Sequence, residues 1–248
     1  MKDTSDGSAF DARRGTFVMR IACRIIAVMV LACLSFGCTA TLHSLREYGP
    51  GNGKGRVVVV ISGVTGPSAY AYVAEDLAEH GYYAVLVDGK DFWNTDDGGE
   101  VFLTEVITRA KQSPHALPGK VSVVGFSLGG EYTLSYATRM PNLVSAVVVY
   151  YPVTHYIKDP DEFVSKIRVP TLMFVGGRDT FMHCCLIETA RKIGDASKRM
   201  EGKSMLEIFE YPYAEHAFVI KSRRAWSPTA AADAFRRTLS HLQEYSDK

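Results

Sequence analysis

A serine between glycines is the first feature of this chain that could do chemistry. It is Ser127, at the centre of the segment Gly125–Gly130. The Gly-x-Ser-x-Gly spacing suits a tight turn from a strand into a helix, because the two small residues let both elements approach closely. A serine on such a turn can act as a nucleophile. The pattern also arises by chance, so its meaning depends on the elements around it.

The flanking segments have the composition of a strand and a helix. Lys120–Val124 is short and rich in β-branched residues, which is typical of a strand buried on both faces. Glu131–Met140 is rich in helix-compatible residues and is followed by Pro141, which a helix interior does not tolerate. These flanks favour catalysis by Ser127 over a role as a simple turn former.

An acid and a base follow this serine along the chain. Asp179 comes just after the strand-like run Val169–Val175, and His216 lies in a loop after the last predicted strand. The order Ser, Asp, His is the one found in α/β-hydrolases. Asp179 also suits the N-cap of the helix predicted after it, and capping is compatible with catalysis.

These three residue types together can transfer an acyl group. An imidazole near neutral pH can take the proton of a serine hydroxyl, and a carboxylate holds that imidazole in the required tautomer. Attack on an ester carbonyl creates an oxyanion that needs preset hydrogen-bond donors. We expect these donors to be the backbone N–H groups of Leu128 and of Val64, which lies in the loop after the first strand.

Substrate-binding residues are harder to assign. Trp93 and Tyr151 follow predicted strand ends and could line a pocket, although packing elsewhere would explain them equally well. No spacing typical of a metal site occurs, so we expect neither a metal nor an organic cofactor. The formal net charge is +1 with lysines and arginines scattered, which gives no indication of nucleic-acid binding.

The elements that must position these residues alternate regularly. Apolar runs predict strands, and helices are predicted between them, with one longer excursion at residues 152–168. This alternation predicts an α/β fold with a mostly parallel central sheet and helices on both faces. The predicted strands are 56–61, 82–87, 120–124, 144–149, 169–175 and 205–210; the predicted helices are 69–79, 99–112, 131–140, 182–193 and 229–245.

The N-terminal forty residues differ from the rest. Arg20 and Arg24 precede an uncharged apolar run, residues 25–37, which is shorter than the roughly 20 residues of a bilayer span but suits a signal peptide. The run ends at Cys38 in a sequence similar to a lipoprotein cleavage box, which predicts lipidation of Cys38 and export to a bacterial cell envelope. An uncleaved membrane anchor, or a periplasmic or secreted protein, is the alternative. Met19 would give a more compact start than Met1.

The sequence therefore predicts a leader over residues 1–40, a linker over 41–55 and one catalytic domain over 56–248. At 248 residues and 47% hydrophobic composition, the chain can bury one sizeable core. Of the five cysteines only Cys184 and Cys185 lie outside the leader. Adjacent cysteines rarely meet disulfide geometry, so we expect two small helical residues there.

Several of these motifs together resemble the dienelactone hydrolase family of α/β-hydrolases. The resemblance runs from about residue 56 to residue 242 and implies the α/β-hydrolase fold, hydrolysis of an ester or lactone, and Ser127, Asp179 and His216 as a catalytic triad. The matching segments are Leu77–Tyr82, Val124–Gly130, Gly176–Asp179, Tyr213–Phe218 and Ala231–Leu239.

The chain also departs from that family. Its founding members use a cysteine nucleophile, where this chain has Ser127, and carry a glutamate in the loop that here reads Ser62-Gly63-Val64. The family's arginine for the substrate carboxylate corresponds to Ile220. We therefore expect a serine hydrolase acting on a small, neutral ester or lactone. A hydrolase-fold lipoprotein that only binds a ligand or partner, and an acyltransferase or peptidase using the same triad, are the alternatives.

Overall fold

Short runs of β-branched residues form the strands at the centre of the molecule. The computed structural model describes residues 45–245 except for 52, 96–98 and 201. The six strands predicted from the sequence are all present within these residues. The strands are β1 (Arg46–Tyr48), β2 (Arg56–Ile61), β3 (Tyr82–Val87), β4 (Val121–Phe126), β5 (Val144–Tyr150), β6 (Thr171–Gly176) and β7 (Leu206–Tyr211).

Helices connect these strands. Short 3-10 turns lie in several of the connections between the strands and the α-helices. The α-helices are α2 (Ala71–Glu79), α3 (Glu100–Lys111), α4 (Leu128–Ser135), α5 (Pro160–Ser165), α6 (Ile187–Arg199) and α7 (Pro228–Tyr245); the 3-10 turns are η1 (Pro67–Ala69), η2 (Gly89–Asn94), η3 (Ala137–Arg139) and η4 (Phe181–His183).

The strands form one seven-stranded sheet with the order β1-β3-β2-β4-β5-β6-β7. All neighbouring strands from β3 to β7 in this order are parallel, and only β1 runs antiparallel, against β3. The predicted mostly parallel sheet is therefore confirmed. The predicted linker over residues 41–55 is wrong in part, because Arg46–Tyr48 is a strand. Three residues are too few to show an alternating pattern, and their pairing with β3 is a tertiary contact.

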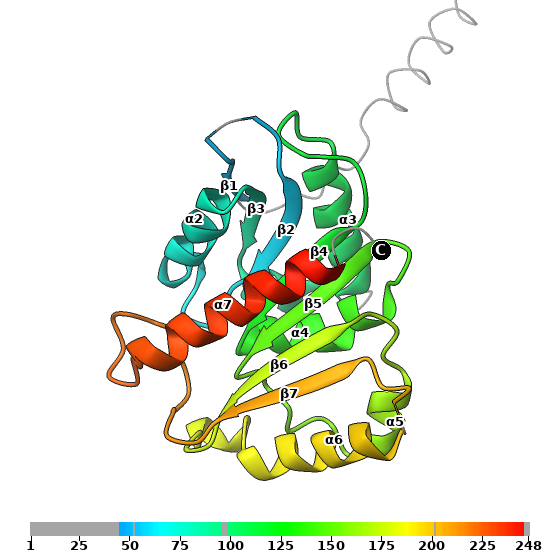
Figure 1. Ribbon diagram of the computed structural model, residues 1–248, viewed down its shortest axis with the longest axis vertical. Helices are drawn as coiled ribbons and strands as arrows, with labels where there is room; N and C mark the ends of the chain where they lie inside the picture. The colour runs from blue at the N-terminus through cyan, green and yellow to red at the C-terminus, as the bar shows by residue number, and fades with distance from the viewer. Residues whose placement is uncertain (1–44, 52, 96–98, 201, 246–248) are drawn as a thin grey trace, which may run out of the picture. The chain divides into compact units, whose positions relative to one another are not determined.

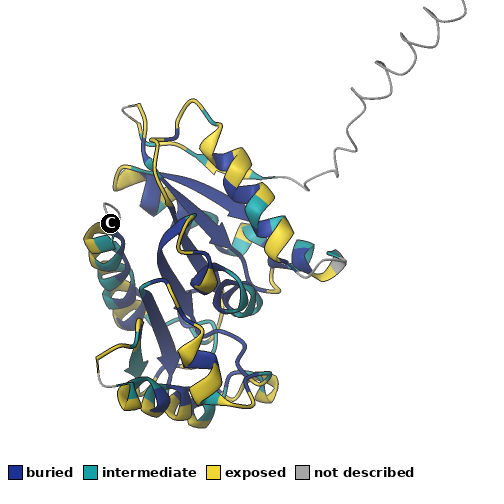
Figure 2. Ribbon diagram, turned by 90° about the vertical axis from the view of Figure 1, so that its right-hand side faces the viewer, coloured by how far each residue is buried: buried dark blue, intermediate teal, exposed yellow. Residues whose placement is uncertain are grey.

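Helices cover both faces of the sheet, as predicted. In Figure 1, α2 and α7 lie in front of the sheet and α3 and α4 lie behind it. Strands β4, β5 and β6 are buried along their whole length, and Figure 2 shows them as a dark layer between helices whose outer faces are exposed. Because both faces are covered, the strand sequences are continuously apolar rather than alternating.

One predicted helix begins later than expected. The sequence predicts a helix over residues 182–193, but α6 begins at Ile187. Before it, Met182 and His183 have positive φ values of 47° and 56°, in the left-handed region. Residues other than glycine adopt this backbone conformation at an energetic cost, and a residue in it cannot be part of a right-handed helix.

The predicted leader over residues 1–40, with Cys38, lies outside the described residues. Among the helices that the structure describes, none combines the length and apolar character that a membrane span requires.

Candidate active site

Ser127 lies on a sharp turn between β4 and α4. Its φ of 51° and ψ of −113° are strained for a residue with a side chain. The backbone around it is nonetheless fixed, because the Ser127 N–H donates to the Tyr150 carbonyl at 3.0 Å and the Ser127 carbonyl accepts from the Val153 N–H at 3.2 Å. This is the strand-to-helix turn that the glycine spacing predicts.

The structure brings the three predicted side chains into one hydrogen-bonded chain. Ser127 Oγ lies 2.9 Å from His216 Nε2, and His216 Nδ1 lies 2.7 Å from Asp179 Oδ2. A carboxylate can only accept, so Nδ1 carries the proton and Nε2 is free to accept from the serine hydroxyl. Asp179 is buried, and its other oxygen, Oδ1, accepts from the Phe181 N–H at 3.0 Å.

Two aromatic rings contact the imidazole of His216. The Phe181 ring stacks on it with centroids 4.5 Å apart and planes only 8° from parallel. The Tyr151 ring meets it edge-on at 4.9 Å. Tyr151 is fully buried while Phe181 is exposed, so the first ring belongs to the core and the second to the surface of the site. Sequence reasoning did not identify Phe181, although its position two residues after Asp179 was a possible signal.

The two predicted oxyanion donors also lie near Ser127. Leu128 is the first residue of α4, so its backbone N–H has no acceptor within the helix. Val64 lies in the loop after β2 and lines the same cavity as Ser127. Helix N-termini favour negative charge, which suits an anion at this position.

Ser127 opens into a cavity of about 310 Å³. Its walls come from the loop after β2, from Phe181 and from the segment that follows His216. The lining residues are Val64, Thr65, Tyr70, Ser127, Phe181, Glu215, His216, Ala217, Ile220, Arg223, Arg224 and Ala225. The exposed Arg223 and Arg224 bring two positive charges to this cavity, where Glu215 is the acidic residue.

Neither Trp93 nor Tyr151, the two predicted substrate-binding residues, lines this cavity. Trp93 follows β3 but is 58% exposed. Tyr151 is fully buried and packs edge-on against His216. A position after a strand end brings a residue to the right edge of the sheet, but the side-chain direction depends on tertiary packing.

The prediction for the two body cysteines is wrong. Cys184 and Cys185 form a disulfide between adjacent residues, and they lie between η4 and α6 rather than in a helix. Because the two residues are adjacent, their Cα atoms lie 3.8 Å apart, closer than in most disulfides, which is why the sequence did not predict the bond. The Cys184 carbonyl accepts from the Thr154 N–H at 2.9 Å, so the pair is also joined to the segment after β5.

A possible metal-ligand group lies at the same place. A sulfur of Cys185, a carboxylate oxygen of Asp179 and a ring nitrogen of His216 lie within 4.8 Å of one another. The aspartate and the histidine are already hydrogen-bonded to each other, and the sulfur is bonded to Cys184. A metal ion would have to replace the hydrogen bond that orients the imidazole, so this group suits the triad better than a metal.

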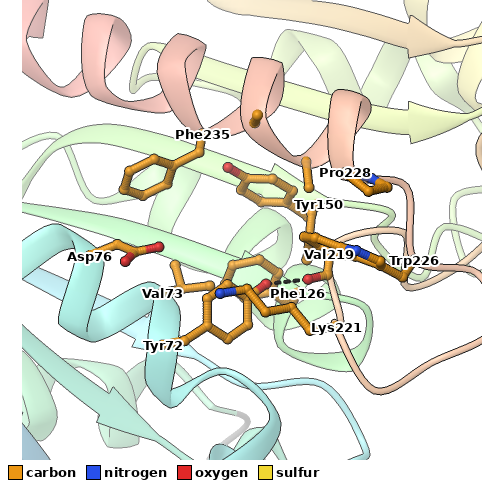
Figure 3. A pocket seen from close by; sticks show the side chains of 12 residues that line it. Tyr72, Val73, Asp76, Phe126, Tyr150, Val219, Lys221, Trp226, Pro228 and Phe235 are labelled. Atoms are coloured by element: carbon orange, nitrogen blue, oxygen red, sulfur yellow. Dashed lines mark hydrogen bonds between the residues drawn. The ribbon is translucent and has the colours of Figure 1, made fainter.

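A second cavity, of about 340 Å³, lies between α2 and α7 (Figure 3). Phe126 and Tyr150 form its floor, and the Tyr72 hydroxyl donates to the Val219 carbonyl across one end. Lys221 extends over the Tyr72 ring, with its ammonium 4.6 Å from the ring centroid. Ser127 is not among the residues that line it.

Comparison with known proteins finds relatives of this chain in sequence and in fold. The sequence model of the dienelactone hydrolase family matches residues 45–246. Among solved structures, "Putative Dienelactone Hydrolase from Klebsiella pneumoniae" superposes with a TM-score of 0.68 at 21% identity, over 81% of this chain and 93% of that chain. At this identity the superposition shows a shared fold.

Two curated relatives show the same similarity in sequence. "Putative carboxymethylenebutenolidase" of Escherichia coli K12 is 30% identical over 134 residues, which are 52% of this chain and 48% of that protein. "Probable 2-oxo-3-(5-oxofuran-2-ylidene)propanoate lactonase" of Bradyrhizobium is 26% identical over 212 residues, or 75% of this chain and 82% of that protein. The match thus covers about half of the first relative and most of the second.

Proposed function

Because this chain belongs to the dienelactone hydrolase family, we propose that it is a serine hydrolase that cleaves a small carboxylic ester or lactone. The observation that carries the proposal is the hydrogen-bonded chain from Ser127 through His216 to the buried Asp179. Each member of the chain has the role that acyl transfer requires, and together they lie at the carboxyl ends of parallel strands, where α/β proteins bind ligands.

The reaction proceeds in two halves. Ser127 Oγ attacks the substrate carbonyl while its proton passes to His216 Nε2, and Asp179 stabilises the imidazolium. The negative oxygen is held by the N–H groups of Leu128 and Val64. The tetrahedral intermediate then expels the alcohol, which takes the proton from His216. Water, activated by the same imidazole, hydrolyses the acyl-enzyme and regenerates Ser127.

Charge at the cavity favours a substrate with a negative group. The sequence predicts a neutral substrate because Ile220 replaces the family's arginine, but Arg223 and Arg224 line the cavity from a nearby position. Arginine forks suit carboxylates. The Bradyrhizobium relative is named for a lactone that carries a propanoate group, which is compatible with this charge. We therefore propose an ester or lactone with a carboxylate near the scissile bond.

The place of action is a separate proposal. We propose that the protein is exported and anchored through lipid on Cys38, on the basis of the apolar run before that cysteine. Intact mass and labelling with a palmitate analogue after expression in a bacterium test this, with Cys38→Ala as the control. An uncleaved leader of unchanged mass would contradict lipidation.

The catalytic proposal is tested by substitution of the nucleophile. Ser127→Ala removes the attacking oxygen, so we expect hydrolysis of p-nitrophenyl acetate to fall by at least about a thousandfold, as for other triad removals. Labelling by a fluorophosphonate probe should disappear as well. The control is Ser145→Ala, which removes another buried serine hydroxyl, on β5. This variant should keep both ester hydrolysis and labelling by the probe.

Full activity in Ser127→Ala would overturn the mechanism. A wild-type protein that neither hydrolyses esters nor reacts with the probe would favour a non-catalytic, ligand-binding hydrolase fold instead. If the probe labels the protein and the acyl group passes to an added alcohol or amine rather than to water, the result would favour an acyltransferase.

A further inference from the structure

Tyr70 is a buried tyrosine that lies beside the nucleophile. It occupies the junction between η1 and α2 and is 1% exposed, yet its side chain lines the cavity into which Ser127 opens. Its ring packs on that of Phe126, the residue before Ser127, with centroids 4.6 Å apart. Two residues later, Tyr72 extends into the other cavity (Figure 3), so the two tyrosines serve different sites.

The position of the Tyr70 hydroxyl follows from the absence of a side chain at Gly63. A Cβ placed on Gly63 would lie 2.5 Å from the Tyr70 hydroxyl oxygen and 3.1 Å from Ser127 Cβ. The phenol oxygen therefore occupies the space where a side chain at position 63 would begin. This space borders both Ser127 and the loop that contains Val64, the predicted oxyanion donor.

The surroundings of this hydroxyl favour its protonated form. Burial raises the pKa of Tyr70, although the Thr65 and Tyr151 side chains, the Gly63 backbone and the charge of Arg223 each act in the opposite direction. A tyrosine with a raised pKa keeps its proton at neutral pH and can only act as a neutral donor or acceptor. The neighbouring Tyr151 is also fully buried, and burial raises the pKa of its hydroxyl as well, so both phenols in this corner of the site keep their protons.

We propose that Tyr70 is a further catalytic residue, whose hydroxyl donates a hydrogen bond to the oxyanion formed when Ser127 attacks. The inference rests on the proposed serine-hydrolase function. In this step the Oγ–carbon bond forms, the carbonyl π electrons move onto oxygen, and the serine proton goes to His216. Tyr70 keeps its own proton throughout and transfers nothing. It adds a side-chain donor to the backbone N–H groups of Val64 and Leu128.

Tyr70→Phe tests this role because it removes one oxygen and keeps the ring that packs on Phe126. Loss of one oxyanion donor typically lowers kcat by about 100- to 1000-fold. With two N–H donors remaining we expect a ten- to hundredfold loss in kcat for p-nitrophenyl acetate, with KM changed less than about twofold, because the bond forms only in the transition state. Inhibition by a boronic acid, which forms a tetrahedral adduct on the serine, should weaken by a similar factor.

The matched control is Tyr83→Phe. Tyr83 on β3 is likewise a fully buried tyrosine, but its ring lies against His115 rather than against the site. This variant should keep wild-type kcat and boronic-acid affinity. A Tyr70→Phe protein with kcat within twofold of wild type, or an equal loss in both variants, would overturn the proposal.

A second measurement covers the case in which Tyr70→Phe folds poorly. Incorporation of a fluorinated tyrosine at position 70 keeps the shape of the side chain but makes its hydroxyl more acidic. Because a phenolate cannot donate, kcat should then decline at a lower pH than in the wild type. An unchanged pH profile would contradict the proposal. The result for Ser127→Ala reports separately on the proposed function, since it asks whether the serine reacts at all.

Discussion

Ser127 keeps a strained backbone because its neighbours hold it in place. Its φ is positive, but hydrogen bonds to Tyr150 and Val153 fix the peptide groups on either side. The same constraint holds the hydroxyl within 2.9 Å of His216 Nε2, so this hydrogen bond is already present in the structure. Strain of this kind, of the order of 1–3 kcal/mol, persists only where the surrounding structure determines it.

Charge near Ser127, the proposed nucleophile, leads to a prediction about substrate choice. We expect the double variant Arg223→Gln/Arg224→Gln to lower kcat/KM for a carboxylate-bearing aryl ester by about three- to tenfold, since each exposed charge contributes less than about 1 kcal/mol. Hydrolysis of neutral p-nitrophenyl acetate should change little. Steady-state kinetics at low and high salt measure this, because salt screens exposed charges.

A suitable control removes two positive charges elsewhere. Lys198→Gln/Arg199→Gln on α6 changes the net charge equally but lies away from the cavity. Equal kinetics of the two double variants on the anionic ester would show that the arginines do not recognise the substrate.

At the scale of elements, the turn at Ser127 depends on close packing of α4 against β2. A Cβ on Gly129 would lie 2.3 Å from the Ile61 carbonyl oxygen and 2.6 Å from that of Ser62. These are backbone atoms in and next to a central strand, and they cannot move without shifting the sheet. The glycine is therefore required by the distance between two elements and not by its own backbone angles.

This packing predicts opposite effects for two glycine substitutions. Gly129→Ala should destabilise the protein by about 1–3 kcal/mol, the usual cost of overpacking, and should lower activity by moving the Leu128 N–H. Gly194→Ala in α6 should stabilise by about 0.5–1 kcal/mol, because its Cβ would meet only Ile208 Cδ1 at 3.6 Å and alanine favours the helix. Urea unfolding measures both. Equal effects of the two substitutions would contradict the packing argument.

For the whole molecule, α7 joins the last part of the chain to the middle of the sheet. Its buried residues include Ala234 and Leu242, which pack against the apolar layer over β5 and β6. The His241 Nε2 lies 3.2 Å from the Pro170 carbonyl oxygen, 71 residues away in sequence. Burial lowers the pKa of His241, which disfavours its charged form in the folded state.

That burial predicts how global stability depends on pH. Below about pH 6.5 the unfolded chain takes up a proton at His241 that the folded chain resists, so acid favours unfolding. At high pH His241 is neutral in both states and does not weaken the fold. As the pH falls below the pKa of the unfolded chain, the free energy of unfolding decreases, and it goes on decreasing until the pH reaches the lower pKa of the folded chain. We expect His241→Gln to lose less stability than the wild type between pH 7 and pH 5, measured by urea midpoints. Identical losses would show that His241 does not titrate with unfolding.

Much of the candidate site could be predicted, because the residue types that it brings together follow a recognisable order in the sequence. A serine, an aspartate and a histidine in this order, each just after a strand, form an uncommon pattern. Parallel strands bring their carboxyl ends to one edge of the sheet, so residues that follow these strands meet there. Tyr70, Phe181 and the two arginines were not predicted. Trp93 and Tyr151 were predicted to line the pocket and do not, since the direction of a side chain after a strand depends on its neighbours.

The sequence by itself determined which groups could react, the alternation of strands and helices, and the family that these patterns resemble. These properties depend on local residue types and on periodicity, which one chain segment contains in full. Only the tertiary structure decided what surrounds Ser127: the Tyr70 hydroxyl over Gly63, the rings around His216 and the disulfide next to α6. Such contacts join segments that are distant in sequence or depend on backbone turns, and each forms only when the sheet and its helices pack together.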